Sequence, residues 1–349
     1  MVIKFHKVLL QKRFPLAISR GVKGNSINLF LSYEKDGHTG WGEAAPGKNE
    51  KAETVEQMQD QLTTFLEEGI ESKTTEELNQ RAKHMGIAPC AYAALDIALW
   101  DWKAKKANVP LHQLLQLPQP FVPTSLTLGI IPPEQVKERI HLMIHESSAK
   151  ALKIKLGSPE GIELDKQMFT QVLESTKQFQ VKIRVDANGG WSTKEAIHMM
   201  QWLAERGVDY IEQPLEEGQE SELKYLYKNR PLPIYIDESC RYAEDVGKWA
   251  NNIDGVNMKL MKCGGITEAL VIIKNAKKYN LKTMIGCMSE SSVSIAAGAA
   301  LSGGIDHIDL DSYYNLAPDP GSGVQLIQGV TLPDFLPGHG ATLKPEYHA

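Results

Sequence analysis

The chain lacks the sequence features of several classes of protein. Its four cysteines, Cys90, Cys240, Cys263 and Cys287, lie far apart and form no C-x-x-C pair, which argues against a structural zinc site and a disulfide scaffold. We expect reduced thiols in the core. No run of about 18 apolar residues is present, and the N-terminal residues do not show an apolar segment followed by a cleavage site. We therefore expect a cytoplasmic protein without a membrane partner.

The chain also has only a small excess of charge of one sign. The formal net charge is −5 and no block of Lys and Arg is present, so we predict no nucleic-acid partner. The 349 residues are 42% hydrophobic and 23% charged, which is typical of a globular protein. This length suffices for one large core and a smaller second domain. A homo-oligomer is compatible with this composition.

The N-terminal third shows the pattern of an α+β domain. Predicted strands are 2–10, 27–34 and 39–43, predicted helices are 53–68, 75–84 and 88–106, and an Asp-Gly turn joins the last two strands. Two polar segments, 15–25 and 45–52, are predicted to be loops, and we expect the first, which contains Arg20, to be mobile. On the third helix we expect Asp96 and Asp101 to be surface or capping residues.

After prolines 118, 120 and 123, short apolar runs alternate with longer amphipathic ones. Eight strands are predicted, at 124–128, 151–156, 181–185, 210–213, 234–236, 255–260, 283–286 and 307–310. Eight strand–helix units in about 200 residues predict a (β/α) barrel, with its active site at the carboxyl ends of the strands. We place this barrel at residues 121–318, and we assign residues 1–120 and the tail 319–349 to the α+β domain.

Two lysines, Lys153 and Lys155, lie within the apolar run 151–156. Side chains two residues apart on a strand point to the same side, so these ammonium groups share one face. A nearby cation and partial burial both lower the pKa of a lysine, which makes it a base at neutral pH. A solvated strand face is the alternative explanation of such a pair, but the rest of the chain favours the buried one.

Three carboxylates recur at the ends of neighbouring strands. Asp186, Glu212 and Asp237 follow one another at intervals of 26 and 25 residues, each the length of one strand–helix unit. Carboxylates gathered at the barrel mouth repel one another unless a cation binds them, and oxygen ligands favour Mg²⁺. Each acid alone would be explained as a helix cap or turn residue, but the periodic trio predicts a metal site.

A lysine flanks this predicted metal site on each side. Lys155 precedes the trio by one strand–helix unit, and Lys259 follows it by one unit. Strands on opposite sides of a barrel face each other, so two bases could address the two faces of one carbon. Lys262 is the alternative to Lys259, which strand alternation places in the strand while Lys262 falls in the loop.

Two further carboxylates, Asp309 and Asp311, share one face at the end of the eighth strand. They lie too far along the barrel to be obvious ligands of the same metal. We interpret them as a receptor for a cation of the substrate, with a strand-end cap as the alternative.

In their order and spacing, these motifs resemble those of the dipeptide epimerases in the muconate lactonizing enzyme subgroup of the enolase superfamily, of which L-Ala-D/L-Glu epimerase is the best-known type. The motifs are KIK at 153–155, VDAN at 185–188, IEQP at 211–214, DES at 237–239, NMKLMKCGG at 257–265, GCMSES at 286–291 and DLD at 309–311. The resemblance covers essentially the whole chain. It implies a modified, enolase-like (β/α) barrel and a capping domain, formed by the N-terminal region and the tail, whose two loops close over the barrel mouth.

The resemblance also implies an isomerase that inverts the α-carbon of the C-terminal residue of a dipeptide. The three carboxylates would hold Mg²⁺, which binds the substrate carboxylate and stabilises the enolate formed on proton loss. Lys155 and Lys259 would be the acid/base groups on opposite faces of the carbon. Lys153 would lower the pKa of Lys155 and neutralise the carboxylate.

In dipeptide epimerases an Asp-x-Asp on the last barrel strand binds the α-ammonium group, and Asp309 and Asp311 match it. In Ala-Glu epimerases an arginine of the first capping loop pairs with the glutamyl side chain, and Arg20 falls in the corresponding region. We expect Met288 to contact the substrate. The sequence SESSVSI after it has no Lys or Arg, which leaves a hydrophobic dipeptide open beside an acidic one.

Other reactions of the subgroup are the nearest alternatives: muconate cycloisomerase, o-succinylbenzoate synthase and N-acylamino acid racemase. The first two act on substrates that have no use for the two carboxylates Asp309 and Asp311. A binding barrel without catalytic activity is the alternative from another class of protein, but it would not need two opposed lysines.

Overall fold

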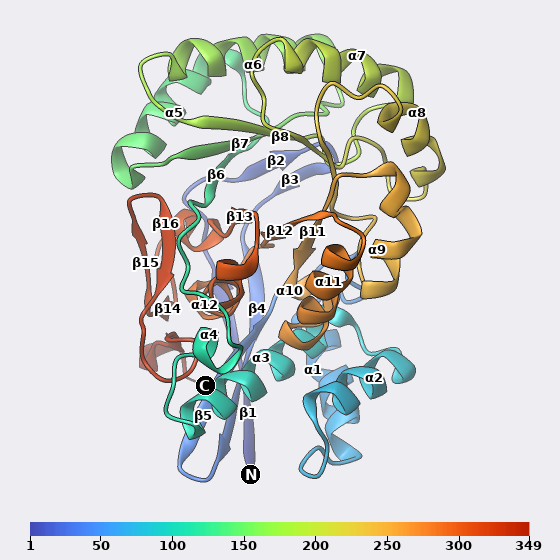
Figure 1. Cartoon of the computed structure of the whole chain (residues 1–349). Helices are drawn as coiled ribbons and strands as arrows, with labels where there is room; N and C mark the ends of the chain where they lie inside the picture. Colours follow the sequence, from blue (N-terminus) through green and yellow to red (C-terminus); the bar gives the residue numbers. More distant parts are fainter. Residues whose placement is uncertain (349) are drawn as a thin grey trace.

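Eight parallel strands form the sheet of the barrel in the computed structural model, which describes residues 1–348 (Figure 1). The strands are β6 (Ser125–Leu128), β7 (Ala151–Lys155), β8 (Lys182–Asp186), β9 (Ile211–Glu212), β10 (Ile234–Ile236), β11 (Gly255–Lys259), β12 (Lys282–Gly286) and β13 (His307–Asp309). Each strand pairs with the next one in the sequence, and a bridge between Thr124 and Ile308 closes the ring. The predicted (β/α) barrel is confirmed.

Helices follow the first seven barrel strands and cover the outside of the sheet (Figure 1). They are α5 (Pro133–Ser147), α6 (Ile162–Thr176), α7 (Thr193–Ala204), α8 (Leu223–Tyr227), α9 (Ala243–Trp249), the short α10 (Leu260–Cys263) with α11 (Ile266–Lys278), and α12 (Ser292–Leu301). After β13 a single 3-10 turn, Ser312–Asn315, leads the chain back toward the capping domain.

Strand alternation decides which side chains reach the barrel interior. On β7, Leu152 and Ile154 are fully buried in the main hydrophobic core. Lys153 and Lys155 point the other way, since both approach Asp186. The two lysines therefore share one buried face, as predicted, and the explanation by a solvated strand face is wrong.

The capping domain is an antiparallel sheet covered by three helices. The sheet has the order β1 (Val2–Leu10), β4 (Ser26–Lys35), β5 (His38–Ala44), and the helices are α1 (Val55–Glu67), α2 (Thr75–Met85) and α3 (Pro89–Lys106). Glycines let α3 approach β5 closely, because a Cβ atom on Gly42 would lie 1.9 Å from the carbonyl oxygen of Ala94. Helix α3 also contacts α10 and α11 of the barrel, so it lies between the capping sheet and the barrel.

Of the two alternatives predicted for Asp96 and Asp101, surface residue or capping residue, the first is wrong, because both faces of α3 are covered and both side chains are fully buried. Asp96 accepts hydrogen bonds from the backbone N–H of Thr267 at 2.9 Å and from its hydroxyl at 2.5 Å, and so caps helix α11 of the barrel. Asp101 accepts from the backbone N–H groups of Trp41 and His339, each at 2.8 Å. Both aspartates satisfy backbone donors of other elements.

The segment predicted to be a mobile loop contains a short hairpin, β2 (Leu16–Ile18) and β3 (Gly21–Lys23). It lies near the strands β7 and β8 (Figure 1), and the N–H of Ile130, in the loop after β6, donates to the carbonyl of Ala17 at 2.8 Å. The polar, glycine-bearing sequence is thus explained by a tight turn and by contacts with the barrel mouth.

The C-terminal tail returns to the N-terminal sheet. Strand β14 (Gly321–Ser322) pairs with β17 (Thr342–Leu343), and β15 (Val324–Ile327) pairs with β16 (Val330–Pro333). Leu343 packs with Val8, Phe30 and Trp41 of the capping sheet. The domain boundaries at residues 120 and 318 stay predictions. Among residues 1–348 no helix combines the length and apolar composition that a membrane crossing requires, and the cytoplasmic location and homo-oligomeric state also stay predictions.

Candidate active site

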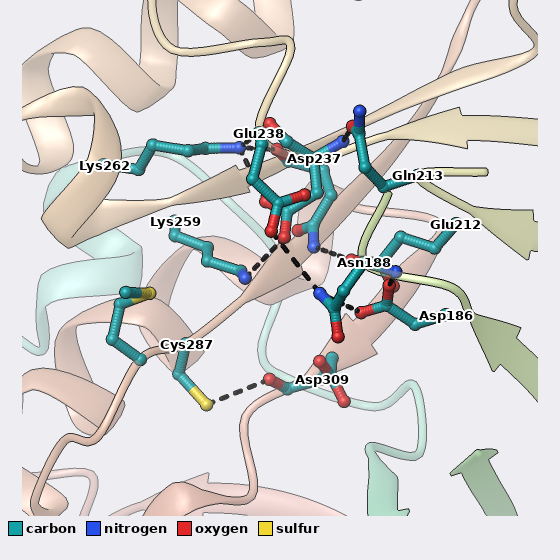
Figure 2. A network of polar contacts seen from close by, with 12 residues as sticks. Asp186, Asn188, Glu212, Gln213, Asp237, Glu238, Lys259, Lys262, Cys287 and Asp309 are labelled. Carbon is teal, nitrogen blue, oxygen red and sulfur yellow. Dashed lines mark hydrogen bonds and ion pairs between the residues drawn. The ribbon is translucent and has the colours of Figure 1, made fainter. Parts of the chain in front are cut away.

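Three carboxylates meet at the carboxyl ends of neighbouring barrel strands. Asp186 ends β8, Glu212 ends β9 and Asp237 follows β10, so that one oxygen of each lies within 4.8 Å of the others (Figure 2). Burial, together with the charge of Asp186, raises the pKa of Glu212 to about 8. Its Oε2 atom is buried without a hydrogen-bond partner, and the Lys153 Nζ lies 3.5 Å away. This donor set fits a divalent cation with oxygen ligands.

Two lysines approach this carboxylate cluster from opposite sides of the barrel. The Nζ of Lys155, on β7, lies 2.5 Å from Oδ2 of Asp186. The Nζ of Lys259, on β11, lies 2.6 Å from Oδ2 of Asp237. Because β7 and β11 are four strands apart in a closed ring of eight, a carbon atom held over the carboxylates would have one lysine on each face.

Lys153 lies at the centre of the cluster and is only 2% exposed. It contacts Asp309 and lies 3.5 Å from Glu212 and 3.8 Å from Asp186. Burial alone would lower the pKa of Lys153, but these three carboxylates outweigh it and raise the pKa well above its ordinary value.

The pKa of Lys259 is raised as well. Burial alone would lower it, but the charges of Asp237 and Glu238 outweigh that effect. The lowering of pKa predicted for the lysine pair is therefore wrong for Lys153, because carboxylates face it directly. A divalent cation bound among the carboxylates would offset that negative charge.

Lys262 is the other lysine beside Asp237. It lies in α10, not in a loop, and all its donors face fixed protein acceptors: Oδ1 of Asp237 at 2.7 Å, the carbonyl of Asn257 at 2.8 Å and the carbonyl of Asp237. Among the described residues, Lys259 donates one side-chain hydrogen bond, to Asp237. An ammonium group held by three acceptors can fix the orientation of Asp237 but has no donor left for a substrate. Lys259 is therefore the better candidate for proton transfer.

The two carboxylates of the last strand lie beside Lys153 because the ring closes between β13 and β6. Oδ2 of Asp311 accepts from the N–H of Thr127 at 2.6 Å, and Oδ1 of Asp309 lies 3.5 Å from the Thr127 hydroxyl. Burial and the neighbouring Asp309 raise the pKa of Asp311 to about 6. A buried carboxylate, Asp309, beside a partly buried one, Asp311, forms a suitable receptor for a cation, and the pair lies closer to the trio than the sequence indicated.

Arg20 lies at the tip of the β2–β3 hairpin and pairs with the protein itself. Its Nη2 is 2.5 Å from Oε1 of Glu238, and its Nη1 donates to the carbonyl of Asn188 at 2.6 Å. Sequence reasoning did not single out Glu238 or Asn188, although each belongs to a motif that also holds a predicted metal ligand (Figure 2). Arg20 and Met288 both line the cavity described below.

Asn257 and Cys287 were also not predicted as site residues. Nδ2 of Asn257 donates to Oε1 of Glu212 at 2.7 Å and orients it. Asn257 precedes Lys259 by two residues, so strand alternation could have identified it. Cys287 was predicted to be a core thiol, but it is partly exposed and lines the cavity, with its Sγ 3.3 Å from the Asp309 carbonyl oxygen.

The lysines, Asp237 and the carboxylates of the last strand line one cavity of about 640 Å³ between the capping domain and the barrel mouth, whereas Asp186 and Glu212 lie behind its wall. Its charged residues include Lys153, Lys155, Lys259, Asp309 and Asp311, and its apolar wall includes Leu16, Ile18, Leu126, Leu128 and Met288. A small molecule with a carboxylate, a cationic group and apolar side chains would match this lining.

Comparison with known proteins agrees with this arrangement. Residues 135–347 match the family described as enolase C-terminal domain-like, and residues 2–116 match the mandelate racemase/muconate lactonizing enzyme N-terminal domain. The chain is 64% identical over 349 residues to a protein named hydrophobic dipeptide epimerase from Flavobacteria bacterium (strain MS024-2A), with 100% of both chains covered. It is 54% identical to a protein of the same name from Roseobacter litoralis, with 99% of each covered.

A solved structure adds a view of a related site with ligands. The dipeptide epimerase from Enterococcus faecalis V583, complexed with Mg and the dipeptide L-Leu-L-Tyr, superposes with a TM-score of 0.89. The two chains are 31% identical, and the match covers 97% of this chain and 98% of the other.

Proposed function

The chain belongs to the mandelate racemase/muconate lactonizing enzyme family of the enolase superfamily, and on this premise we propose that it is a Mg²⁺-dependent epimerase of hydrophobic dipeptides. It inverts the α-carbon of the C-terminal residue. The observation that carries the proposal is the opposed pair of Lys155 and Lys259, which reach one carboxylate cluster from strands on opposite sides of the barrel.

Asp186, Glu212 and Asp237 would hold the metal. When bound, Mg²⁺ supplies a positive charge that binds the substrate carboxylate and favours the negative charge developing beside it. Lys155 and Lys259 act on the α-carbon: one accepts the proton from one face, and the other donates a proton to the opposite face, which inverts the centre.

Lys153 has a supporting role in this scheme. Its ammonium group, buried among the three carboxylates nearest to it, would donate to the substrate carboxylate and neutralise part of its charge.

Asp309 and Asp311 bind the free α-ammonium group of the dipeptide. Asp309 is 2% exposed and Asp311 is partly buried, so an ammonium group placed between them is less screened than in water and strongly attracted. Cycloisomerisation and o-succinylbenzoate formation offer no cation for this pair, which supports epimerisation over those alternatives.

The second residue of the dipeptide is hydrophobic in this proposal. Arg20, the only candidate that the sequence offered for an acidic side chain, already pairs with Glu238 and with the carbonyl of Asn188. Leu16 and Ile18 of the same hairpin contribute apolar surface to the cavity. The names of the relatives that are 64% and 54% identical agree with this specificity.

Proton NMR in D₂O with Mg²⁺ tests the proposal. We expect the α-proton signal of the C-terminal residue to disappear and a second diastereomer to grow with L-Leu-L-Tyr and L-Ala-L-Phe, and much more slowly with L-Ala-L-Glu. EDTA abolishes the exchange, and Lys155→Met abolishes the growth of the second diastereomer. The matched control is Lys177→Met, at an exposed position at the C-terminal end of helix α6. We expect this variant to keep full activity. Absence of exchange with every dipeptide would refute the proposed function.

A further inference from the structure

One wall of the cavity is made by residues 287–291, here called the wall loop, which connects β12 to α12. Cys287, Met288 and Ser289 line the cavity, and Sγ of Cys287 lies 3.9 Å from Oδ1 of Asp311. In the proposed binding mode the aspartate pair holds the α-ammonium group, which belongs to the first residue of the dipeptide. The wall loop therefore faces the side chain of that first residue.

The wall loop belongs to no strand or helix within the described residues, and two side chains of the capping sheet fix its backbone. Nδ2 of Asn28, on β4, donates to the carbonyl of Ser289 at 2.7 Å. Glu43, on β5, accepts from the N–H of Ser291 at 3.0 Å and from its hydroxyl at 2.6 Å. Asn28 also donates to Glu43 at 2.7 Å, so the two act as one unit.

This unit is fully buried and satisfies groups that have few other partners. Asn28 and Glu43 are both 0% exposed. Oε2 of Glu43 also lies 3.2 Å from the N–H of Ser294, one of the free donors in the first turn of α12. Removing one partner from such a network leaves buried polar groups unpaired, so the backbone shifts to find new ones. Neither side chain lines the cavity itself.

We propose that Asn28 and Glu43 are positioning residues that set the selectivity of this enzyme for the first residue of its dipeptide. They act at a distance, because the capping sheet holds the backbone of Ser289 and Ser291 and thereby the shape of the wall beside the ammonium site. Selectivity for the second residue depends on the side near Arg20 and is independent of them. The inference rests on the proposed function.

The test compares ratios of kcat/KM in the wild type and in Asn28→Leu, which keeps the shape of the side chain and removes both donors. The first ratio, kcat/KM for L-Ala-L-Leu over that for L-Leu-L-Leu, reports on the first residue of the dipeptide. The second ratio, kcat/KM for L-Leu-L-Leu over that for L-Leu-L-Phe, reports on the second residue. We expect the first ratio to change by about fivefold or more, as the loss of a buried hydrogen bond implies, and the second ratio to stay constant. Glu43→Gln, measured at pH 8, is the second variant and decides the question if Asn28→Leu does not fold.

Asp101→Asn is the control for a general weakening of the capping sheet. Asp101 is equally buried and also bonds to β5, through the N–H of Trp41 at 2.8 Å, but none of its contacts reaches the wall loop. We expect this variant to lower Tm and to leave both ratios unchanged. Equal changes in both ratios would overturn the inference. A first ratio that is unchanged in folded Asn28→Leu and in folded Glu43→Gln would do the same. Neither outcome would affect the proposed function. If the wild type exchanges no α-proton, the proposed function fails and the inference falls with it.

Discussion

Replacement of Asp96 by Asn changes how stability depends on pH. Asp96 is buried against the start of α11, and burial, opposed by the hydrogen bonds from Thr267, raises its pKa to about 7 from the model-compound value of 3.8. Lys103 is the charged group that acts on it. A carboxyl whose pKa is raised by folding binds its proton more tightly in the native state. Its contribution is therefore fully present below pH 3.8 and is lost as the pH rises toward 7.

The size of this effect follows from the shift. At about 1.36 kcal/mol per pH unit, the full change is about 4 kcal/mol, of which roughly 2 to 3 kcal/mol falls between pH 5 and pH 8. Urea unfolding of wild type and Asp96→Asn, in the same buffers with EDTA, should show their difference in free energy of unfolding shrink by that amount over this range. All other titrating groups cancel in the difference. A constant difference between pH 5 and pH 8 would show that Asp96 is ionised in the native state and would refute the reasoning.

Two further predictions concern the reaction. In Lys155→Met and in Lys259→Met the rate of epimerisation should fall by about 10³-fold. Each variant should still exchange the α-proton of one diastereomer in D₂O, because one base remains on one face of the carbon. The diastereomer that exchanges should differ between the two variants. Exchange of both diastereomers by either variant would contradict the assignment. Asp309→Asn should raise KM for L-Leu-L-Tyr by about 10- to 100-fold through loss of a charged hydrogen bond, whereas activity on an N-acetylated dipeptide, which has no ammonium group, should not fall further. An equal loss on both substrates would contradict the ammonium role.

The sequence was sufficient for the fold and for the clustering of the carboxylate trio because both depend on periodicity. The predicted strands agree with the observed ones to within a few residues, as for 210–213 against β9 (Ile211–Glu212). Since each acid lies where a parallel strand ends, its spacing in the sequence predicts its place in the ring. The same alternation explains why Lys153 and Lys155 share one face.

The remaining features depend on contacts that have no period in the sequence. Lys153 on β7 meets Asp309, 156 residues away in the chain, because the ring closes between β13 and β6, the strand next to β7. Arg20 meets Glu238 because a hairpin of the capping domain lies over the barrel mouth. The raised pKa of Lys153 and the burial of Asp96 follow from such contacts, so an inspection of neighbouring residues in the sequence could not predict them.

The return of the tail to the first sheet has a consequence for the order of synthesis. The ribosome produces the capping sheet before the barrel, but Leu343, which packs with Val8 and Trp41, is made only after the barrel. His339, which bonds to Asp101 and to the Trp41 carbonyl, is equally late. The barrel is therefore an insertion that has to be translated in full before the domain begun by the first ten residues can complete its core. Domains that fold as units during translation do so in the order in which they are finished, and here the domain begun before the barrel is finished after it.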